Sequence, residues 1–276
     1  MAGTELAGNG YLLGEVGAPA GIGEEGTLSF VLRDPQGAPL TEFQRQHGKE
    51  LHLIVVRSDG AHFRHVHPVL DPASGTWSLP WSWDAAGSYR LFADFSPSGG
   101  EPLTLSHLVE VGGQYAPAPA TGPVTSTSVG GFDVSISGEL VGGGMGDVSI
   151  RVERGGHPVT TLEPYLGAFG HLVALRDGDL AYLHIHPHGD EPSEGDTSGP
   201  TVDFMAHTPT AGRYLLYFDF QVGGQVHSAH LVLDAASGAP GGAAHHGSHN
   251  DHGDHGGHEP GGHDSHGGGH DVHGMH

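Results

Sequence analysis

The sequence predicts an all-β protein made of two tandem, duplicated β-sandwich domains of the immunoglobulin or cupredoxin-like kind, followed by a disordered histidine-rich tail. Three observations carry this prediction. The 276-residue chain contains 49 Gly and 19 Pro, a composition typical of many turns between short strands. No long segment keeps a helical hydrophobic period. One half of the chain also repeats the other.

The internal repeat is a gap-free match between two histidine-rich segments. Residues 52 to 68 read HLIVVRSDGAHFRHVHP, and residues 171 to 187 read HLVALRDGDLAYLHIHP, an offset of 171 − 52 = 119 residues. The match continues upstream (GTLSFVLRDP with GDVSIRVERG) and downstream (AAGSYRLFADF with TAGRYLLYFDF). A repeat of domain length predicts a duplicated domain rather than a duplicated motif.

Each copy reads as alternating strands separated by Gly, Pro and Asp-Gly turns. In chain order we expect strands within 26–43, 52–68, 77–83, 85–95 and 107–111, and their counterparts within 146–163, 171–187, 210–220 and 230–234. Alternation in WSLPWSW places Trp77, Trp81 and Trp83 on one strand face, which favours core packing. The predicted boundaries are 1–115 for the first copy, 116–126 for a Pro-rich linker, 127–237 for the second copy and 238–276 for the tail.

The histidines of the repeated segment are predicted to share one face of a hairpin. If Asp59-Gly60 forms the turn, His52 lies opposite His67, and His65 lies two residues from His67 on the same face. In the second copy, a turn at Gly178-Asp179 pairs His171 with His186, whereas a turn at Asp177-Gly178 pairs it with His184. Cross-strand neighbours lie about 5 Å apart at Cβ, so three imidazoles per hairpin can converge on a metal ion. A later strand in each copy offers a further candidate ligand, His107 or His230.

A structural role for the same histidines stays open. Their strand face also carries apolar side chains, so the rings can pack in or beside a core and hydrogen-bond to one another or to Asp94 and Asp219. Duplication also makes the two motifs one observation instead of two.

The tail gives a second, independent prediction of metal binding. Its histidines recur every few residues between Gly and Asp, and no Lys or Arg follows Asp234. Such a segment cannot bury enough apolar surface to fold, and neutral imidazoles suit Zn, Cu and Ni. The predicted tail ligands are His245, His246, His249, His252, His255, His258, His263, His266, His270, His273 and His276.

Charge and composition exclude several classes of function. The formal net charge of −22 disfavours nucleic acid and anionic membranes as partners and favours cations. The absence of cysteine rules out disulfides, thiolate nucleophiles and Fe–S clusters. No apolar run is long enough to span a bilayer, and the N-terminus lacks the pattern of a signal peptide.

The blocks HGKELHLIVVRSDGAHFRHVHP, GSYRLFADFSPSGG, EPYLGAFGHLVALRDGDLAYLHIHP and GRYLLYFDF resemble a group of mostly actinobacterial proteins described as secreted or heavy-metal-binding-domain proteins, with FixH-like or YtkA-like β-sandwiches. The resemblance covers nearly all of residues 10–234, and the paired HxHP motifs are its most specific part. It implies a cell-envelope or secreted protein concerned with metals, especially copper. The N-terminus does not display the corresponding signal, so the compartment stays open.

Three functions follow from these observations. The first is binding, sequestration or delivery of Cu(II), Zn(II) or Ni(II) in metal homeostasis or resistance, by a protein that is not an enzyme. The second is a structural or interaction module built of tandem sandwiches with a metal-buffering tail. The third is a metal-dependent enzyme, because HVHP resembles the copper-ligand strand of copper-zinc superoxide dismutases, although the remaining motifs of that family cannot be placed in this sequence.

Overall fold

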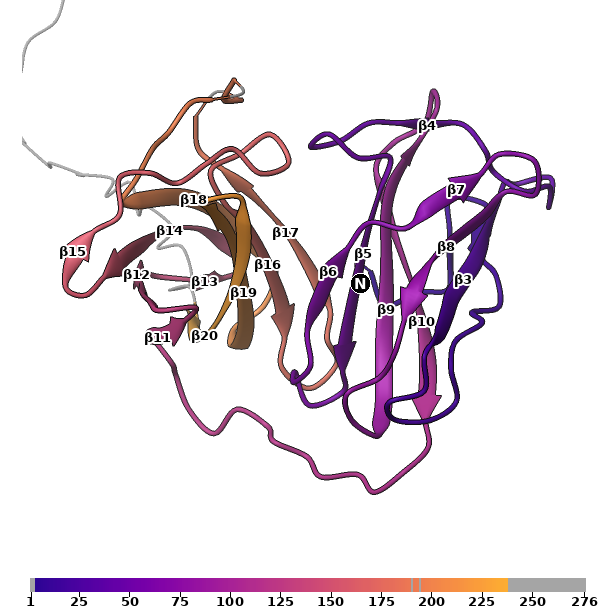
Figure 1. Ribbon diagram of the computed structural model, residues 1–276, viewed down its shortest axis with the longest axis horizontal. Helices are drawn as coiled ribbons and strands as arrows, with labels where there is room; N and C mark the ends of the chain where they lie inside the picture. The colour runs from indigo at the N-terminus through magenta and orange to yellow at the C-terminus, as the bar shows by residue number, and fades with distance from the viewer. Residues whose placement is uncertain (1–2, 190, 194, 238–276) are drawn as a thin grey trace, which may run out of the picture. The chain divides into compact units, whose positions relative to one another are not determined.

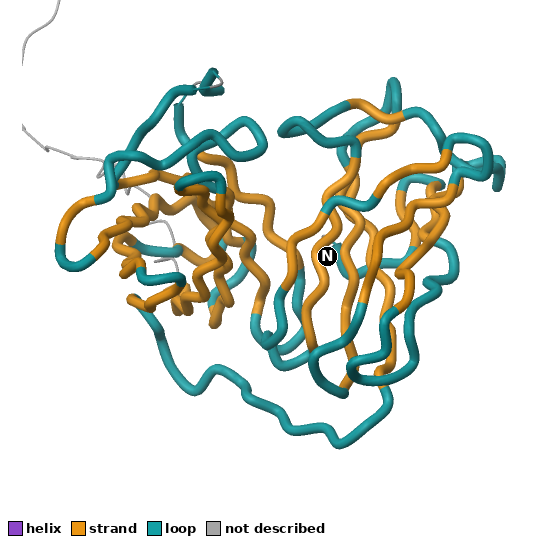
Figure 2. The backbone as a smooth tube through the Cα atoms, viewed as in Figure 1, coloured by secondary structure: helices purple, strands orange, loops and turns teal. Residues whose placement is uncertain are grey.

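The computed structural model describes residues 3–189, 191–193 and 195–237. Within these ranges every regular element is a β-strand, and strands are connected by turns and loops (Figure 2). The all-β prediction and the duplication are therefore confirmed. The predicted tail, 238–276, lies outside the described residues.

The first copy forms two sheets (Figure 1). One sheet has the order β1-β2-β3-β8-β7, and the other has the order β10-β9-β5-β6, with β4 added alongside β9. The strands are β1 (Ala7–Gly8), β2 (Tyr11–Leu13), β3 (Gly26–Arg33), β4 (Phe43–Gln44), β5 (Leu51–Arg57), β6 (Arg64–Val66), β7 (Val69–Asp71), β8 (Thr76–Trp81), β9 (Gly87–Pro97) and β10 (Leu103–Val111).

The second copy repeats this plan with one difference. Its strand β17 pairs with both β16 and β18, so the two sheets join into one, whereas the first copy splits the equivalent segment into β6 and β7 on either side of His67 and Pro68. The strands are β11 (Ser126–Val129), β12 (Phe132–Gly138), β13 (Val141–Gly142), β14 (Gly144–Arg154), β15 (His157–Pro158), β16 (His171–Arg176), β17 (Tyr182–Pro187), β18 (Thr201–Thr208), β19 (Gly212–Val222) and β20 (Gln225–Ser237).

Each copy encloses its own apolar core. In the first, Leu28, Phe30 and Leu32 alternate inward from β3 and meet the inward side chains of β5 and β9. Trp77, Trp81 and Trp83 are all buried in this core, which confirms the face predicted from their spacing. The second copy has an equivalent core of its own, built around Phe204, Phe218 and Phe220.

A third apolar cluster lies between the copies. It joins residues from the outward faces of β5 and β9 to residues from the outward faces of β16 and β19. At its centre the rings of Phe63 and Tyr217 stack with centroids 3.8 Å apart and an interplanar angle of 5°. The Tyr217 hydroxyl donates a hydrogen bond to the carbonyl oxygen of Gly60 at 2.6 Å. The face of each hairpin that carries the histidines is therefore partly covered by the other copy.

The Tyr217 hydrogen bond gives a first testable prediction. We expect Tyr217→Phe to lower the free energy of unfolding by about 1 kcal/mol, because it removes a hydrogen bond from a buried aromatic contact but keeps the ring. Urea denaturation measures this change. Tyr115→Phe is the matched control, since Tyr115 is 47% exposed and its substitution should change stability by less than about 0.5 kcal/mol. Equal stability of the Tyr217→Phe variant and the wild type would contradict the prediction.

Candidate metal centre

The hairpin of β5 and β6 positions the three histidines of the first copy. The observed pairs are Leu53 with Val66, Ile54 with His65 and Val55 with Arg64. This register extrapolates to His52 opposite His67, as predicted. The turn itself differs from the predicted two-residue turn: the Arg57 N–H donates to the Ala61 carbonyl, and His62 takes a left-handed conformation with φ of 54°. The extra residue acts as a bulge that restores the predicted register.

Three imidazoles converge at the end of this hairpin. The Nδ1 atom of His52 lies 3.0 Å from Nε2 of His65 and 3.2 Å from Nε2 of His67. The three ligand atoms all lie within 4.8 Å of one another, and the three ring centroids are 4.9 to 5.2 Å apart. Two ligands bound at about 2.0–2.1 Å to a tetrahedral metal ion lie about 3.3 Å from each other. Two of the three sides of this histidine triad therefore already have the length that a shared metal ion requires.

Hydrogen bonds to oxygen fix the tautomers of two of these rings. His52 donates from Nε2 to the carbonyl oxygen of Gln46 at 3.0 Å. His65 donates from Nδ1 to a carboxylate oxygen of Asp219 at 2.8 Å, and both of these side chains are 5% exposed. Carbonyl and carboxylate oxygens only accept, so in the neutral rings His52 Nδ1 and His65 Nε2 both carry lone pairs. Two lone pairs that face each other at 3.0 Å repel, so this contact requires either a proton on one of the two nitrogens, which makes it a hydrogen bond, or a metal ion bound by both.

Asp219 belongs to the second copy, so the triad is completed across the boundary between copies. In its own sheet Asp219 pairs with His171, as Asp94 pairs with His52 in the first copy. Asp94 in turn accepts hydrogen bonds from Thr104 and, at 3.4 Å, from Tyr182 of the second copy. A carboxylate that holds the far nitrogen of a histidine is the usual support of a metal-bound imidazole. The hydrogen bonding anticipated for a structural role and the geometry needed for metal binding thus occur together.

Burial favours the neutral form of two of the three histidines. Burial, together with the neighbouring His65, lowers the pKa of His52 to about 3 and that of His67 to about 2. Neutral imidazole is the form that binds metals, so these two ligands need no deprotonation at neutral pH.

The second copy shows the same backbone arrangement. Val173 pairs with His184 and Leu175 with Tyr182, which is the register of the first predicted alternative, with His171 opposite His186. His171 is buried, and burial lowers its pKa to about 4. The backbone places residues 184 and 186 at the positions equivalent to His65 and His67; their predicted role as ligands stays a prediction.

The positions of His107 in β10 and His230 in β20 correct the prediction that these two histidines are further ligands. His107 pairs with Leu91, an inner core residue, and so lies on the sheet face opposite to His52. His230 pairs with Tyr217 and packs its ring 4.8 Å from that ring, beside Phe63 instead of the triad. The register of β10 on β9 differs by one residue from the register of β20 on β19. A shift of one residue turns a side chain to the other face of a sheet. The aligned sequences HLVEV and HLVLD give no sign of this shift.

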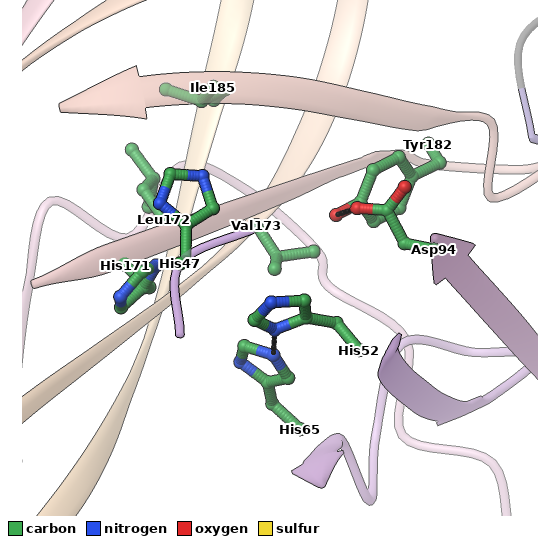
Figure 3. A pocket seen from close by; sticks show the side chains of 9 residues that line it. All are labelled: His47, His52, His65, Asp94, His171, Leu172, Val173, Tyr182 and Ile185. Carbon is green, nitrogen blue, oxygen red and sulfur yellow. Dashed lines mark hydrogen bonds between the residues drawn. The ribbon is translucent and has the colours of Figure 1, made fainter. Parts of the chain in front are cut away.

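His47 is a site residue that the repeat did not predict. Its ring lies 6.1 Å from His52 and 5.4 Å from His171, and Figure 3 shows it beside His171. The second copy has Leu166 at the equivalent position, so a search for repeated histidines passes over it. One sequence feature could have indicated His47. This residue stands directly before Gly48, in the turn that leads into a histidine-bearing strand.

The remaining predictions concern the tail and the membrane. All eleven predicted tail ligands lie outside the described residues. Among the described residues, no helix has the length and apolar character needed to cross a bilayer.

The fold and the histidine triad define a class: a duplicated β-sandwich protein with a candidate metal centre at the boundary between its copies. The chain belongs to the family described as Domain of unknown function (DUF8832), whose model matches residues 9–113 and 127–237. The two matches correspond to the two copies. No curated protein matches the chain.

Several solved structures resemble the chain at low similarity. They include the adhesin InvE of Yersinia pseudotuberculosis (12% identity, TM-score 0.23, covering 83% of this chain and 60% of that one). A Salmonella alpha-2-macroglobulin mutant shares 15% identity with a TM-score of 0.28, over 86% of this chain and 15% of that one. Domains 4 and 5 of the S-layer protein SbsC share 10% identity with a TM-score of 0.23, over 78% and 83%. The chain thus spans less than two thirds of the first two, and scores this low establish no relationship of function.

Proposed function

We propose that the protein binds a divalent transition metal ion, Cu(II), Zn(II) or Ni(II), through His52, His65 and His67, and serves to sequester or deliver it. The supporting observation is the convergence of one ring nitrogen from each of the three histidines within 4.8 Å, with the far nitrogens of His52 and His65 held by oxygen atoms. An all-nitrogen ligand set suits these three ions. Three protein ligands leave one tetrahedral position for a water molecule or for a ligand from a delivery partner.

The tail extends this proposal. A series of imidazoles spaced by Gly and Asp binds several ions weakly and releases them as the histidines gain protons near pH 6.5. It would capture ions that the triad then holds more selectively. We propose a binding protein and not an enzyme, because the triad is supported by buried hydrogen bonds and the sequence supplies no further catalytic motif.

Equilibrium dialysis against Cu(II), Zn(II) or Ni(II), followed by elemental analysis, tests the proposal. The protein for this experiment is the full-length chain with its eleven tail histidines replaced by glutamine, so that only the folded copies can retain metal. We expect tightly held metal that is lost when the triad is substituted. Absence of retained metal in this protein would overturn the proposal.

A structural role is the second candidate, and the His65–Asp219 hydrogen bond favours it. Under this alternative the histidines hold the copies together, beside the apolar cluster that Phe63 and Tyr217 form. Substituting His65 would then lower the free energy of unfolding of a protein that retains no metal. Dialysis and denaturation of the same variants separate the two functions.

Asp219 provides a prediction specific to the metal function. We expect Asp219→Asn to weaken metal binding by the triad about 10- to 100-fold, because the carboxylate that orients His65 and increases its basicity is lost. Competition with a chromophoric chelator measures the affinity. Asp203→Asn is the control, since Asp203 is exposed and its carboxylate accepts a hydrogen bond from the Ser149 hydroxyl. An unchanged affinity with reduced stability would assign Asp219 a structural role only.

A further inference from the structure

His171 is held in the same way as His52. Its Nε2 donates a hydrogen bond at 2.7 Å to the carbonyl oxygen of Tyr165, six residues earlier in the chain. His52 donates in the same manner to Gln46, also six residues earlier. The Nδ1 atom of neutral His171 therefore carries a lone pair, as the Nδ1 atom of His52 does within the triad.

His47 reaches this second histidine from the other copy. The centroids of the His47 and His171 rings are 5.4 Å apart, with an interplanar angle of 78°, close to the 4.9 to 5.2 Å found within the triad. Reciprocal backbone hydrogen bonds between Gln46 and Lys49 close the turn that carries His47. The position of this residue is thus set by the backbone as well as by its ring contacts.

A small cavity lies where these rings meet (Figure 3). It has a volume of about 30 Å³, and its lining includes His47, His52, His65, His171 and Asp94. A cavity of this size holds one water molecule, and therefore also one metal ion. Beside His52 and His65, which belong to the triad, the imidazoles of His47 and His171 and the Asp94 carboxylate line this space, so it favours a cation.

The two copies differ at this point. His47 and Leu166 occupy equivalent turn positions and have nearly the same left-handed conformation, with φ of 50° and 54°. Only the first copy places a histidine there. The site around His171 accordingly gains an imidazole from its neighbour that the triad of His52, His65 and His67 does not receive.

We propose that His47 and His171, one from each copy, are ligands of a second transition metal ion, so that the chain holds two ions near the boundary between its copies. This inference rests on the proposed function, because it assigns the same class of ion to a second place. With a ligand from each copy, the second ion links the copies directly, whereas the triad takes its ligands from the first copy alone.

Zn(II) stoichiometry tests the second site, in the full-length protein with the tail histidines replaced by glutamine. We expect about two tightly held ions per chain, and about one after His47→Leu, which installs the residue found naturally at the equivalent position. His67→Gln should likewise leave about one ion, and the double variant should hold none. Leu166→Ala, the control in the opposite turn, should keep both ions.

The outcomes distinguish this inference from the proposed function. Two ions retained by His47→Leu, or one ion lost by Leu166→Ala, would remove His47 as a ligand. A single ion in the parent protein, lost on His67→Gln, would overturn the second site and leave the triad in place. No bound ion at all would overturn both. Far-ultraviolet circular dichroism verifies that each variant is folded, and His47→Gln, which keeps a polar side chain, should lose the same ion as His47→Leu.

Discussion

Substituting His67 by glutamine should weaken metal binding by the triad at least about 100-fold without unfolding the protein. His67 is the most suitable of the three histidines for this test, because it is half-buried and, within the described residues, its hydrogen bonding is confined to the contact of its Nε2 atom with Nδ1 of His52. His52 and His65 each also hold a group outside the triad, so their substitution would disturb the fold. Loss of one of three nitrogen ligands removes a whole metal–ligand bond, and an amide oxygen is a poor replacement for borderline metals.

Chelator competition with Zn(II) or Cu(II) measures this loss in the protein whose tail lacks histidine. His107→Gln is the matched control: it is the same substitution, in a strand of the same sheet, on the opposite face. We expect the control to bind metal as the parent does. Equal affinities of the His67→Gln variant and the parent would show that the triad is a hydrogen-bonded structural cluster, whatever the tail binds.

The sequence was sufficient to predict the hairpins because their register depends on local features. A two-residue period fixes the face of each side chain, and the turn between two strands fixes which residues lie opposite. His52, His65 and His67 therefore came together as expected, even though the turn itself was longer. The three tryptophans followed from the same period.

Contacts between the copies could not be predicted in this way. Aligning one copy on the other identifies equivalent residues, but it does not show which residues of one copy meet the other. The sequence suggests Asp219 as a hydrogen-bond partner of the histidines without indicating which histidine it contacts. The bond that it forms with His65 joins residues 154 positions apart. His47 was missed because it breaks the repeat, and His107 was misplaced because its strand is shifted by one residue. The residues that interrupt the duplication therefore distinguish the surroundings of His52 from those of His171.

The same buried histidines should make the metal-free protein sensitive to mild acid. The pKa values of His52 and His171 in the folded protein are about 3 and about 4, lowered mainly by burial, against about 6.5 in an unfolded chain. Below pH 6.5 the unfolded state therefore binds protons that the folded state does not. Stability contributed by these two residues is complete above pH 6.5 and is lost as the pH falls toward 4. Each should reduce the free energy of unfolding by about 1.4 kcal/mol per pH unit in this range.

Several charged or titratable groups face these two rings. His65, His171 and His47 face His52, and each disfavours a positive charge there. His65 and His47 act on His171 in the same sense, whereas Asp219 opposes them. Carboxylates held by partners, such as Asp59 with its pKa of about 2, lose their contribution only at lower pH. The interval from pH 6.5 to 4 is therefore governed by the histidines.

Urea denaturation at a series of pH values, with chelator present, measures this dependence. His171→Gln should reduce the slope of stability against pH by about 1.4 kcal/mol per pH unit, because one proton fewer distinguishes the two states. A slope that His171→Gln does not alter would mean that His171 is already protonated in the folded protein. The comparison therefore isolates the contribution of the His171 imidazole to the acid response.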